Sequence, residues 1–282
     1  MRILISAKQN AVGLRAAKRL HKELVKFSDV EFDPSTAKKL KKFRGRGTAI
    51  KKFDGDLIIS LGGDGTFLWT GYQARVPILP VRLEGYGFLC SVNFKELIKN
   101  MEMLQKKNYR IIPQMRLQCT KSRKGIIDRI FRGTYPLSIN EIAFARKRPS
   151  KILDIEMSIA GCPPMRFAGD GVMFATPAGS TAYSASAGGA VLDPHLDAVI
   201  IVPLYPFNSK VKPIVVPANK KIHITVKSGD CALIVDGHSG DYFKADSEFV
   251  VEKAEPIKVV HFGENRFYDK FKKVFIDSEM PE

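Results

Sequence analysis

The chain has 282 residues, of which 45% are hydrophobic and 26% charged, a composition typical of a globular protein that buries a sizeable core in two domains. No apolar run approaches the roughly 20 residues that a membrane-spanning helix needs, and residues 1–5 lack the layout of a signal peptide. We therefore expect a cytoplasmic protein with no membrane partner. Its 4 cysteines are scattered without metal-ligand spacing, as in a reducing compartment.

The formal net charge is +16, and most of the excess lies in the first third of the chain. The densest basic run, residues 38–46, could contact nucleic acid, but it lacks interleaved aromatic residues and any known binding motif. We interpret it as a solvated surface and expect no nucleic-acid partner. A basic surface also attracts polyanionic nucleotides, so the charge by itself does not select a function.

Strand and helix patterns alternate over the first 110 residues or so. Apolar runs predict strands, and Val12, Ala16, Leu20 and Leu24 recur at helical spacing. We expect strands at 1–6, 56–61 and 77–83, helices at 11–26 and 94–105, and a helix or loop at 36–52. This alternation favours a doubly wound, Rossmann-like α/β domain over residues 1–112, whose ligands lie beyond the carboxyl ends of the strands.

The pattern changes near residue 111 to short apolar runs broken by Gly, Pro, Asn and Asp, which predict a β-rich domain over residues 113–262. One helix is expected at 180–190. In the tail, Phe267, Phe271 and Phe275 at four-residue steps predict a helix that completes the first domain within residues 263–282. The expected strands of the β-rich domain are 115–119, 126–131, 138–145, 152–159, 171–175, 199–202, 221–226 and 231–235.

The first domain is organised around residues 57–66, Leu-Ile-Ile-Ser-Leu-Gly-Gly-Asp-Gly-Thr, which predict a strand, a tight turn and the start of a helix. Glycines let a ligand approach the backbone, and free N–H groups at a helix start can cradle phosphate oxygens. A carboxylate repels phosphate, so its presence in a phosphate site indicates a role other than anion binding. Asp64 suits the removal of a proton from a hydroxyl group that attacks phosphorus.

A second polar cluster lies in the β-rich half. It consists of Asn140-Glu141, Gly169-Asp170-Gly171 and the small-residue stretch 176–189. A carboxylate can accept hydrogen bonds from both hydroxyls of a ribose, and short polar side chains suit the edge of a purine. Taken alone, an Asn-Glu pair often occurs by chance, and an aspartate between two glycines, as at Asp170, is most often a turn residue. The long stretch is more informative, because its residues build no core.

Together, Gly62-Gly63-Asp64-Gly65-Thr66, Asn140-Glu141, Asp170-Gly171 and Thr176-Pro177-Ala178-Gly179-Ser180-Thr181-Ala182-Tyr183 resemble the NAD kinase family, in the family's order and over nearly the whole chain. The resemblance implies an α/β N-terminal domain, a β-rich NAD-binding domain and an active site between them. It implies transfer of the terminal phosphoryl group of ATP or polyphosphate to the 2′-hydroxyl of the adenosine ribose of NAD, in a homodimer or homotetramer. No carboxylate cluster suggests a metal cage, so we expect no metal-ligating residues and a divalent ion, Mg²⁺, carried on the donor phosphates.

The resemblance also implies roles for individual residues. Asp64 would be the proton acceptor and Asn140 and Glu141 would hold the adenosine ribose, while Lys151 would lie near the phosphates and Asp170 toward the nicotinamide half. The remaining substrate-binding candidates are Gly63, Gly65, Thr66 and Phe67 around the glycine turn, Thr181, Ala182, Tyr183 and Ser186 at the adenine, and Tyr205 and His238 at its margins. The chain departs from the family pattern at Ala168, His238 and residues 82–87, positions that bear on the phosphate clamp and on the choice between NAD and NADH.

Two other functions compete with this one. A lipid or sugar kinase could share the glycine-aspartate turn, although it leaves Asn140-Glu141 and residues 176–183 unexplained. A non-catalytic nucleotide or nucleic-acid binder could use the basic first third. The phosphoryl donor, the preference for NAD or NADH and the oligomer size are left open by the sequence.

Overall fold

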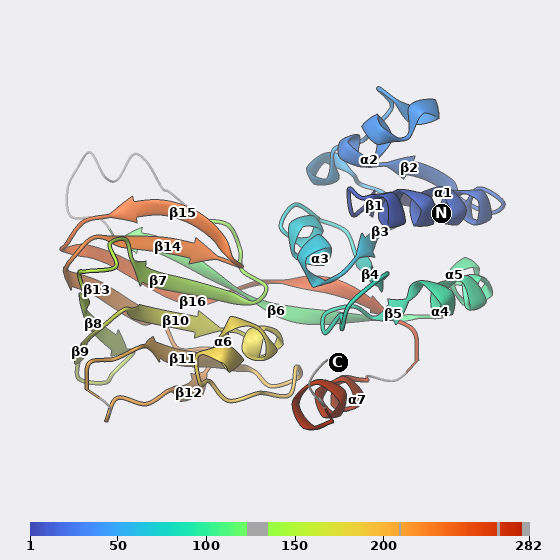
Figure 1. Cartoon of the computed structure of the whole chain (residues 1–282). Helices are drawn as coiled ribbons and strands as arrows, with labels where there is room; N and C mark the ends of the chain where they lie inside the picture. The colour runs from blue at the N-terminus through green and yellow to red at the C-terminus, as the bar shows by residue number, and fades with distance from the viewer. Residues whose placement is uncertain (123–134, 209, 264–265, 278–282) are drawn as a thin grey trace. The chain divides into compact units, whose positions relative to one another are not determined.

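The computed structural model describes residues 1–122, 135–208, 210–263 and 266–277, so the strand expected at 126–131 lies outside the described residues. The chain forms two compact units (Figure 1). Unit 1 comprises Met1–Pro113 and Ile257–Glu282, and unit 2 comprises Gln114–Pro256. Residues 257–262, which the sequence placed in the second domain, belong to unit 1, where Val259 pairs with Ile78. Among the described residues, no helix is long and apolar enough to cross a membrane.

Unit 1 contains a parallel sheet. Its strands, in the order β2-β1-β3-β4, are β2 (Asp29–Phe32), β1 (Arg2–Ala7), β3 (Leu57–Gly62) and β4 (Ile78–Arg82), with β5 (Val92–Asn93) and the end of β16 (Ser247–His261) beside β4. The strands expected at 1–6, 56–61 and 77–83 are confirmed within one residue at each end. Parallel pairing places the carboxyl ends of β1, β3 and β4 at one edge of the sheet, which is where ligands bind in such folds.

Helices cover both faces of this sheet. They are α1 (Ala11–Leu24), α2 (Pro34–Lys39), α3 (Asp64–Gly71), α4 (Phe94–Lys99) and α5 (Met101–Gln105). On one face, Ile5 and Ile59 pack in a cluster with Leu20 of α1. On the other, the hydroxyl of Thr70 in α3 bonds those of Ser60 and Ser6, at 3.1 and 3.4 Å. The doubly wound architecture expected from the sequence is confirmed.

Local signals explain where these helices begin and end. The Asn10 side chain accepts a hydrogen bond from the N–H of Gly13, which caps the start of α1. Residues 94–105 form two helices rather than the single one expected. Asn100 lies between α4 and α5 outside helical geometry, and its side-chain amide bonds the carbonyl of Glu96.

Unit 2 consists of two antiparallel sheets with the residues of one core between them. One has the order β16-β13-β8-β9 and the other β12-β11-β10-β7-β14-β15, and β6 pairs with β16. Phe144 of β7 and Phe249 of β16 meet with ring centroids 4.8 Å apart. The strands are β6 (Arg110–Ser122), β7 (Glu141–Arg146), β8 (Leu153–Ile159), β9 (Met165–Gly169), β10 (Gly171–Ala175), β11 (Ala198–Leu204), β12 (Ile214–Pro217), β13 (Ile222–Ser228), β14 (Cys231–Val235) and β15 (His238–Phe243).

Two expected helices are shorter than the sequence suggested. In place of a helix at 180–190 there is a 3₁₀ turn, Ala178–Thr181, followed by α6, Tyr183–Ser186. Gly188 then adopts a φ of 84°, which ends the helix. In the tail, α7 (Phe267–Phe271) continues into a π-helical turn, Lys272–Ile276.

Candidate active site

The glycine-aspartate turn joins β3 to α3. A Cβ at Gly62 would lie 2.1 Å from the hydroxyl oxygen of Thr66, whereas a Cβ at Gly65 would meet nothing within 4 Å. The fold therefore requires glycine at 62 but leaves open space at 65. The N–H groups of Thr66 and Phe67 both bond the carbonyl of Gly63, so those of Asp64 and Gly65 have no partner within the helix. Such N–H groups can bind an anion.

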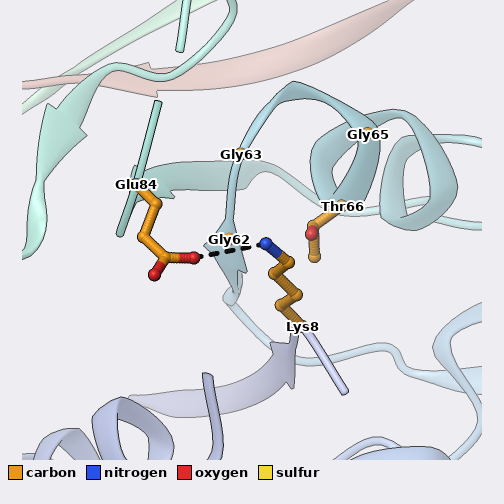
Figure 2. Close-up of a pocket in the computed structure, with 6 residues that line it drawn as sticks. All are labelled: Lys8, Gly62, Gly63, Gly65, Thr66 and Glu84. Carbon is orange, nitrogen blue, oxygen red and sulfur yellow. Dashed lines mark hydrogen bonds and ion pairs between the residues drawn. The ribbon is translucent and has the colours of Figure 1, made fainter. Parts of the chain in front are cut away.

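A cavity of about 340 Å³ adjoins this turn (Figure 2). Lys8, which follows β1, and Glu84, which follows β4, both line it and form an ion pair with an Nζ–Oε2 distance of 3.3 Å, and both side chains are about half exposed. The cavity is lined by Lys8, Gly62, Gly63, Gly65, Thr66 and Glu84. Sequence reasoning missed Lys8, although a lysine directly after a buried parallel strand is a usable signal for the phosphate edge of such a sheet.

The carboxylate of Asp64 is held by a neighbouring loop. Its Oδ2 accepts the N–H of Phe88 and its Oδ1 accepts the N–H of Leu89, both at 2.9 Å. Each carboxylate oxygen can accept more than one hydrogen bond, so Asp64 is oriented and keeps capacity for a further hydrogen bond, although it is not among the residues that line the cavity. Burial, followed by the negative charge of Asp64, raises the pKa of the Cys90 thiol to about 12. That thiol stays protonated and lies 3.8 Å from Oδ1 of Asp64.

In unit 2, Asn140 and Glu141 stand at the start of β7 with exposed fractions of 7% and 6%. Asn140 Oδ1 and Glu141 Oε2 are buried, and neither has a hydrogen-bond partner within the part of the chain that the structure describes. Burial, with a smaller contribution from the charge of Asp236, raises the pKa of Glu141 to about 7. Two buried acceptors without partners, on consecutive residues, call for a ligand that carries hydrogen-bond donors, such as hydroxyl groups.

Asp236 fixes the backbone of this pair. Its carboxylate accepts the N–H groups of Ile139, Asn140 and Glu141 at 2.8, 2.7 and 3.0 Å. It adopts a φ of 47° in the turn between β14 and β15, where Asp-Gly is a common hairpin sequence. Sequence analysis did not identify Asp236, because the Asp-Gly pair indicates only a turn.

The small-residue stretch that begins at Thr176 hydrogen-bonds to the backbone of Ile139 and Asn140. The Thr176 hydroxyl donates to the carbonyl of Ile139 at 2.6 Å, and its N–H donates to the carbonyl of Asn140 at 2.8 Å. A Cβ at Gly179 would lie 2.2 Å from the carbonyl oxygen of Asn140. Glycine at 179 is therefore required by the contact between the two motifs.

The other candidates occupy varied environments. Asp170 lies between β9 and β10, and its Oδ2 is 3.0 Å from Nη2 of Arg146, so its charge is already paired. Phe67 is fully buried, and Tyr205, 80% exposed, has a φ of 42°. Thr181 and Ala182 are partly buried, whereas Lys151, Tyr183, Ser186 and His238 are exposed. These placements leave the substrate contacts of the candidates as predictions.

Among the described residues, no group of three or more His, Cys, Asp or Glu side chains could hold a metal ion. The groups that could bind phosphate are instead the backbone N–H groups of the turn and the side chain of Lys8. This set of donors fits phosphate oxygens, which can carry their own divalent ion.

Comparisons with known proteins identify the family to which the chain belongs. The ATP-NAD kinase C-terminal domain family matches residues 139–262. The NAD kinase of Pyrococcus abyssi is 30% identical over 274 residues, covering 95% of this chain and 96% of the relative, and that of Bacteroides fragilis is 32% identical over 223 residues, covering 77% and 74%. The chain belongs to the NAD kinase family.

Solved structures of NAD kinases and NADH kinases share the fold. The crystal structure of an NAD kinase from Archaeoglobus fulgidus in complex with ATP matches with a TM-score of 0.72 and 26% identity, over 98% of this chain and 97% of that one. The crystal structure of yeast NADH kinase complexed with NADH matches with a TM-score of 0.88 and 24% identity, over 99% and 89%. The resemblance to the NAD kinase family noted from the motifs is thereby confirmed.

Proposed function

We propose that this member of the NAD kinase family transfers the terminal phosphoryl group of ATP, or of inorganic polyphosphate, to the 2′-hydroxyl of the adenosine ribose of NAD, which forms NADP. The observation that carries the proposal is the carboxylate of Asp64. It stands at the start of α3, is fixed by two N–H groups, and immediately follows the glycines that line a cavity.

Asp64 is the proton acceptor in this proposal. A secondary hydroxyl is a weak nucleophile at neutral pH, so a carboxylate within hydrogen-bond reach assists by removing its proton as the new P–O bond forms. The 2′-oxygen attacks the terminal phosphorus, and the bond from that phosphorus to the bridging oxygen breaks. The leaving group is ADP when ATP is the donor, or a polyphosphate one unit shorter when polyphosphate is the donor. The proton of the 2′-hydroxyl passes to Asp64.

Asn140 and Glu141 hold the ribose. Asn140 Oδ1 and Glu141 Oε2 are buried acceptors without partners in the described part of unit 2, and ribose hydroxyls would supply the missing donors. A ligand without these hydroxyls leaves both acceptors unpaired, at a cost of about 1–3 kcal/mol each. This pair accordingly favours a ribose over a lipid as the acceptor of the phosphoryl group.

The phosphates bind at the glycine turn. Lys8 and the free N–H groups at the start of α3 supply positive charge and donors. Mg²⁺ carried on the donor phosphates would neutralise the charge that develops on the leaving group. We further propose that the protein is cytoplasmic and forms a homodimer or homotetramer, as the resemblance to the family implies.

The test is a turnover assay in which NAD or NADH is combined with ATP or polyphosphate in the presence of Mg²⁺. An NADP-specific dehydrogenase reports the product. We expect NADP or NADPH from at least one combination and none when the acceptor is left out. Absence of product from all four combinations, together with phosphorylation of diacylglycerol, sphingosine or a sugar phosphate, would overturn the proposal in favour of a lipid or sugar kinase.

A further inference from the structure

A lysine of the C-terminal helix binds the loop that holds Asp64. Lys270 of α7 lies with its ammonium group within hydrogen-bond distance of the carbonyl oxygens of Gly87, Phe88 and Cys90, at 2.9, 3.1 and 2.6 Å. An ammonium group has three N–H donors, so all three are used on one short segment. The three carbonyl groups lie 180 to 183 residues from the lysine in the sequence, which is why no local pattern reveals the contact.

Two peptide groups connect Lys270 to Asp64. The carbonyl of Gly87 and the N–H of Phe88 belong to one peptide group, as do the carbonyl of Phe88 and the N–H of Leu89. In each group the carbonyl accepts from Lys270 and the N–H donates to the carboxylate of Asp64. Both peptide dipoles therefore run between a positive and a negative side chain.

This arrangement is favourable for two reasons. A cation at the carbonyl polarises the peptide group and strengthens its N–H as a donor, because linked hydrogen bonds reinforce one another. The same contact also fixes the direction in which the N–H points. The third bond, to the carbonyl of Cys90, holds the end of the loop and keeps its thiol next to Asp64.

Other contacts of the C-terminal segment do not involve the Lys270 ammonium group. Arg266 pairs with Glu96 at 2.7 Å, and the rings of Phe88 and Phe275 lie 5.9 Å apart between centroids. Phe267 is buried. Removing the charge of Lys270 should therefore leave α7 folded while it releases the loop at residues 87–90.

We propose that Lys270 is a positioning residue for phosphoryl transfer, which orients the Asp64 carboxylate through the peptide groups between Gly87 and Leu89. The inference rests on the proposed function, in which Asp64 accepts the proton of the attacking hydroxyl. It adds the C-terminal helix to the groups that determine the rate of that step. Lys270 itself touches neither the substrate nor the reacting atoms in this scheme.

The test compares Lys270→Met with wild type and with Lys273→Met, which removes an exposed lysine from the following turn. We expect Lys270→Met to lower kcat by about 10-fold or more, equivalent to about 1.4 kcal/mol, with KM for NAD and ATP changed less than about 2-fold. Lys270→Arg, which keeps the charge, should retain more activity than Lys270→Met. Unchanged kcat in Lys270→Met, or lower activity in Lys270→Arg than in Lys270→Met, would overturn the inference.

A double-mutant comparison separates positioning from general damage to the fold. In an Asp64→Asn background the loop no longer holds a carboxylate, so adding Lys270→Met should reduce kcat by less than about 2-fold. The same factor in both backgrounds would show that Lys270 acts independently of Asp64 and would overturn the inference. If wild type forms no NADP at all, the proposed function fails instead, and the two failures are distinguishable.

Discussion

The carboxylate of Asp236 accepts a 2.7 Å hydrogen bond from the N–H of Asn140, and the flanking N–H groups of Ile139 and Glu141 donate to the same side chain. These bonds hold the backbone from behind and leave the Asn140 and Glu141 side chains free to contact a ligand. The ribose site of the proposed NAD kinase thus depends on a residue 96 positions away from Asn140.

Asp236→Asn tests this support. An amide keeps the size of the side chain and tolerates the positive φ, but its NH₂ group would face N–H donors. We expect KM for NAD to rise about 10-fold and stability to fall by about 1–3 kcal/mol. Asp246→Asn is the matched control, because Asp246 is exposed and has a φ of 62°. Equal behaviour of the two variants in steady-state kinetics and urea unfolding would contradict the role of Asp236.

Glu141 predicts a pH dependence of stability. Its pKa is raised from 4.5 to about 7 in the fold, so the folded state retains a proton that the unfolded chain has released. Stability of the free protein should fall as the pH rises from about 4.5 through 7, by up to about 3 kcal/mol. In Glu141→Gln this loss should be absent, so the free energy of unfolding of the variant should rise relative to that of wild type between pH 5 and pH 8. Parallel pH profiles of the two proteins in urea unfolding would contradict the assignment.

Gly65 and Gly62 should respond differently to alanine. At Gly65 a methyl group has free space and α3 gains a better helix former, so stability should be unchanged or rise by up to about 1 kcal/mol. Activity should still fall, with KM for the phosphoryl donor raised about 10-fold, because the methyl group obstructs phosphate at the turn. Gly62→Ala should instead destabilise by about 1–3 kcal/mol through its clash with Thr66. Normal kinetics in Gly65→Ala would show that phosphate binds elsewhere.

Substitutions at Lys8 and Glu84 should have opposite effects on KM for the phosphoryl donor. Lys8→Met removes a cation from the cavity and should raise KM for ATP about 10-fold, while Glu84→Gln frees Lys8 from its ion pair and should lower KM for ATP a few-fold. KM for NAD should not change in either variant. Lys107→Met, which removes an exposed lysine paired with Asp56, is the control. Identical changes in both variants would argue against an anion site in the cavity.

The sequence predicted features that depend on local pattern. Apolar runs identified β3 and β14, and the spacing of Ala16, Leu20 and Leu24 identified α1, because burial on one face imposes a period on the chain. The glycine-aspartate turn was correctly placed between a strand and a helix. The four-residue β2 and β12 were missed because they are short and have few buried residues.

Features that depend on distant contacts could not be predicted. Asp236 and Lys270 gain their significance from partners 96 and 183 residues away. A lone lysine or an Asp-Gly pair carries no information about such a partner. The buried, unpartnered oxygens of Asn140 and Glu141 are likewise visible only in the folded chain.

The most direct test of this account is the rate of NADP formation by wild type and Asp64→Asn, measured side by side at saturating NAD and donor. Asparagine preserves the shape of the side chain but cannot take the proton of the 2′-hydroxyl. We predict that wild type produces NADP and that kcat in the variant is lower by at least about 10²-fold, measured at a temperature at which both proteins are folded. NADP formation at the wild-type rate in Asp64→Asn would contradict the role of Asp64 as the proton acceptor.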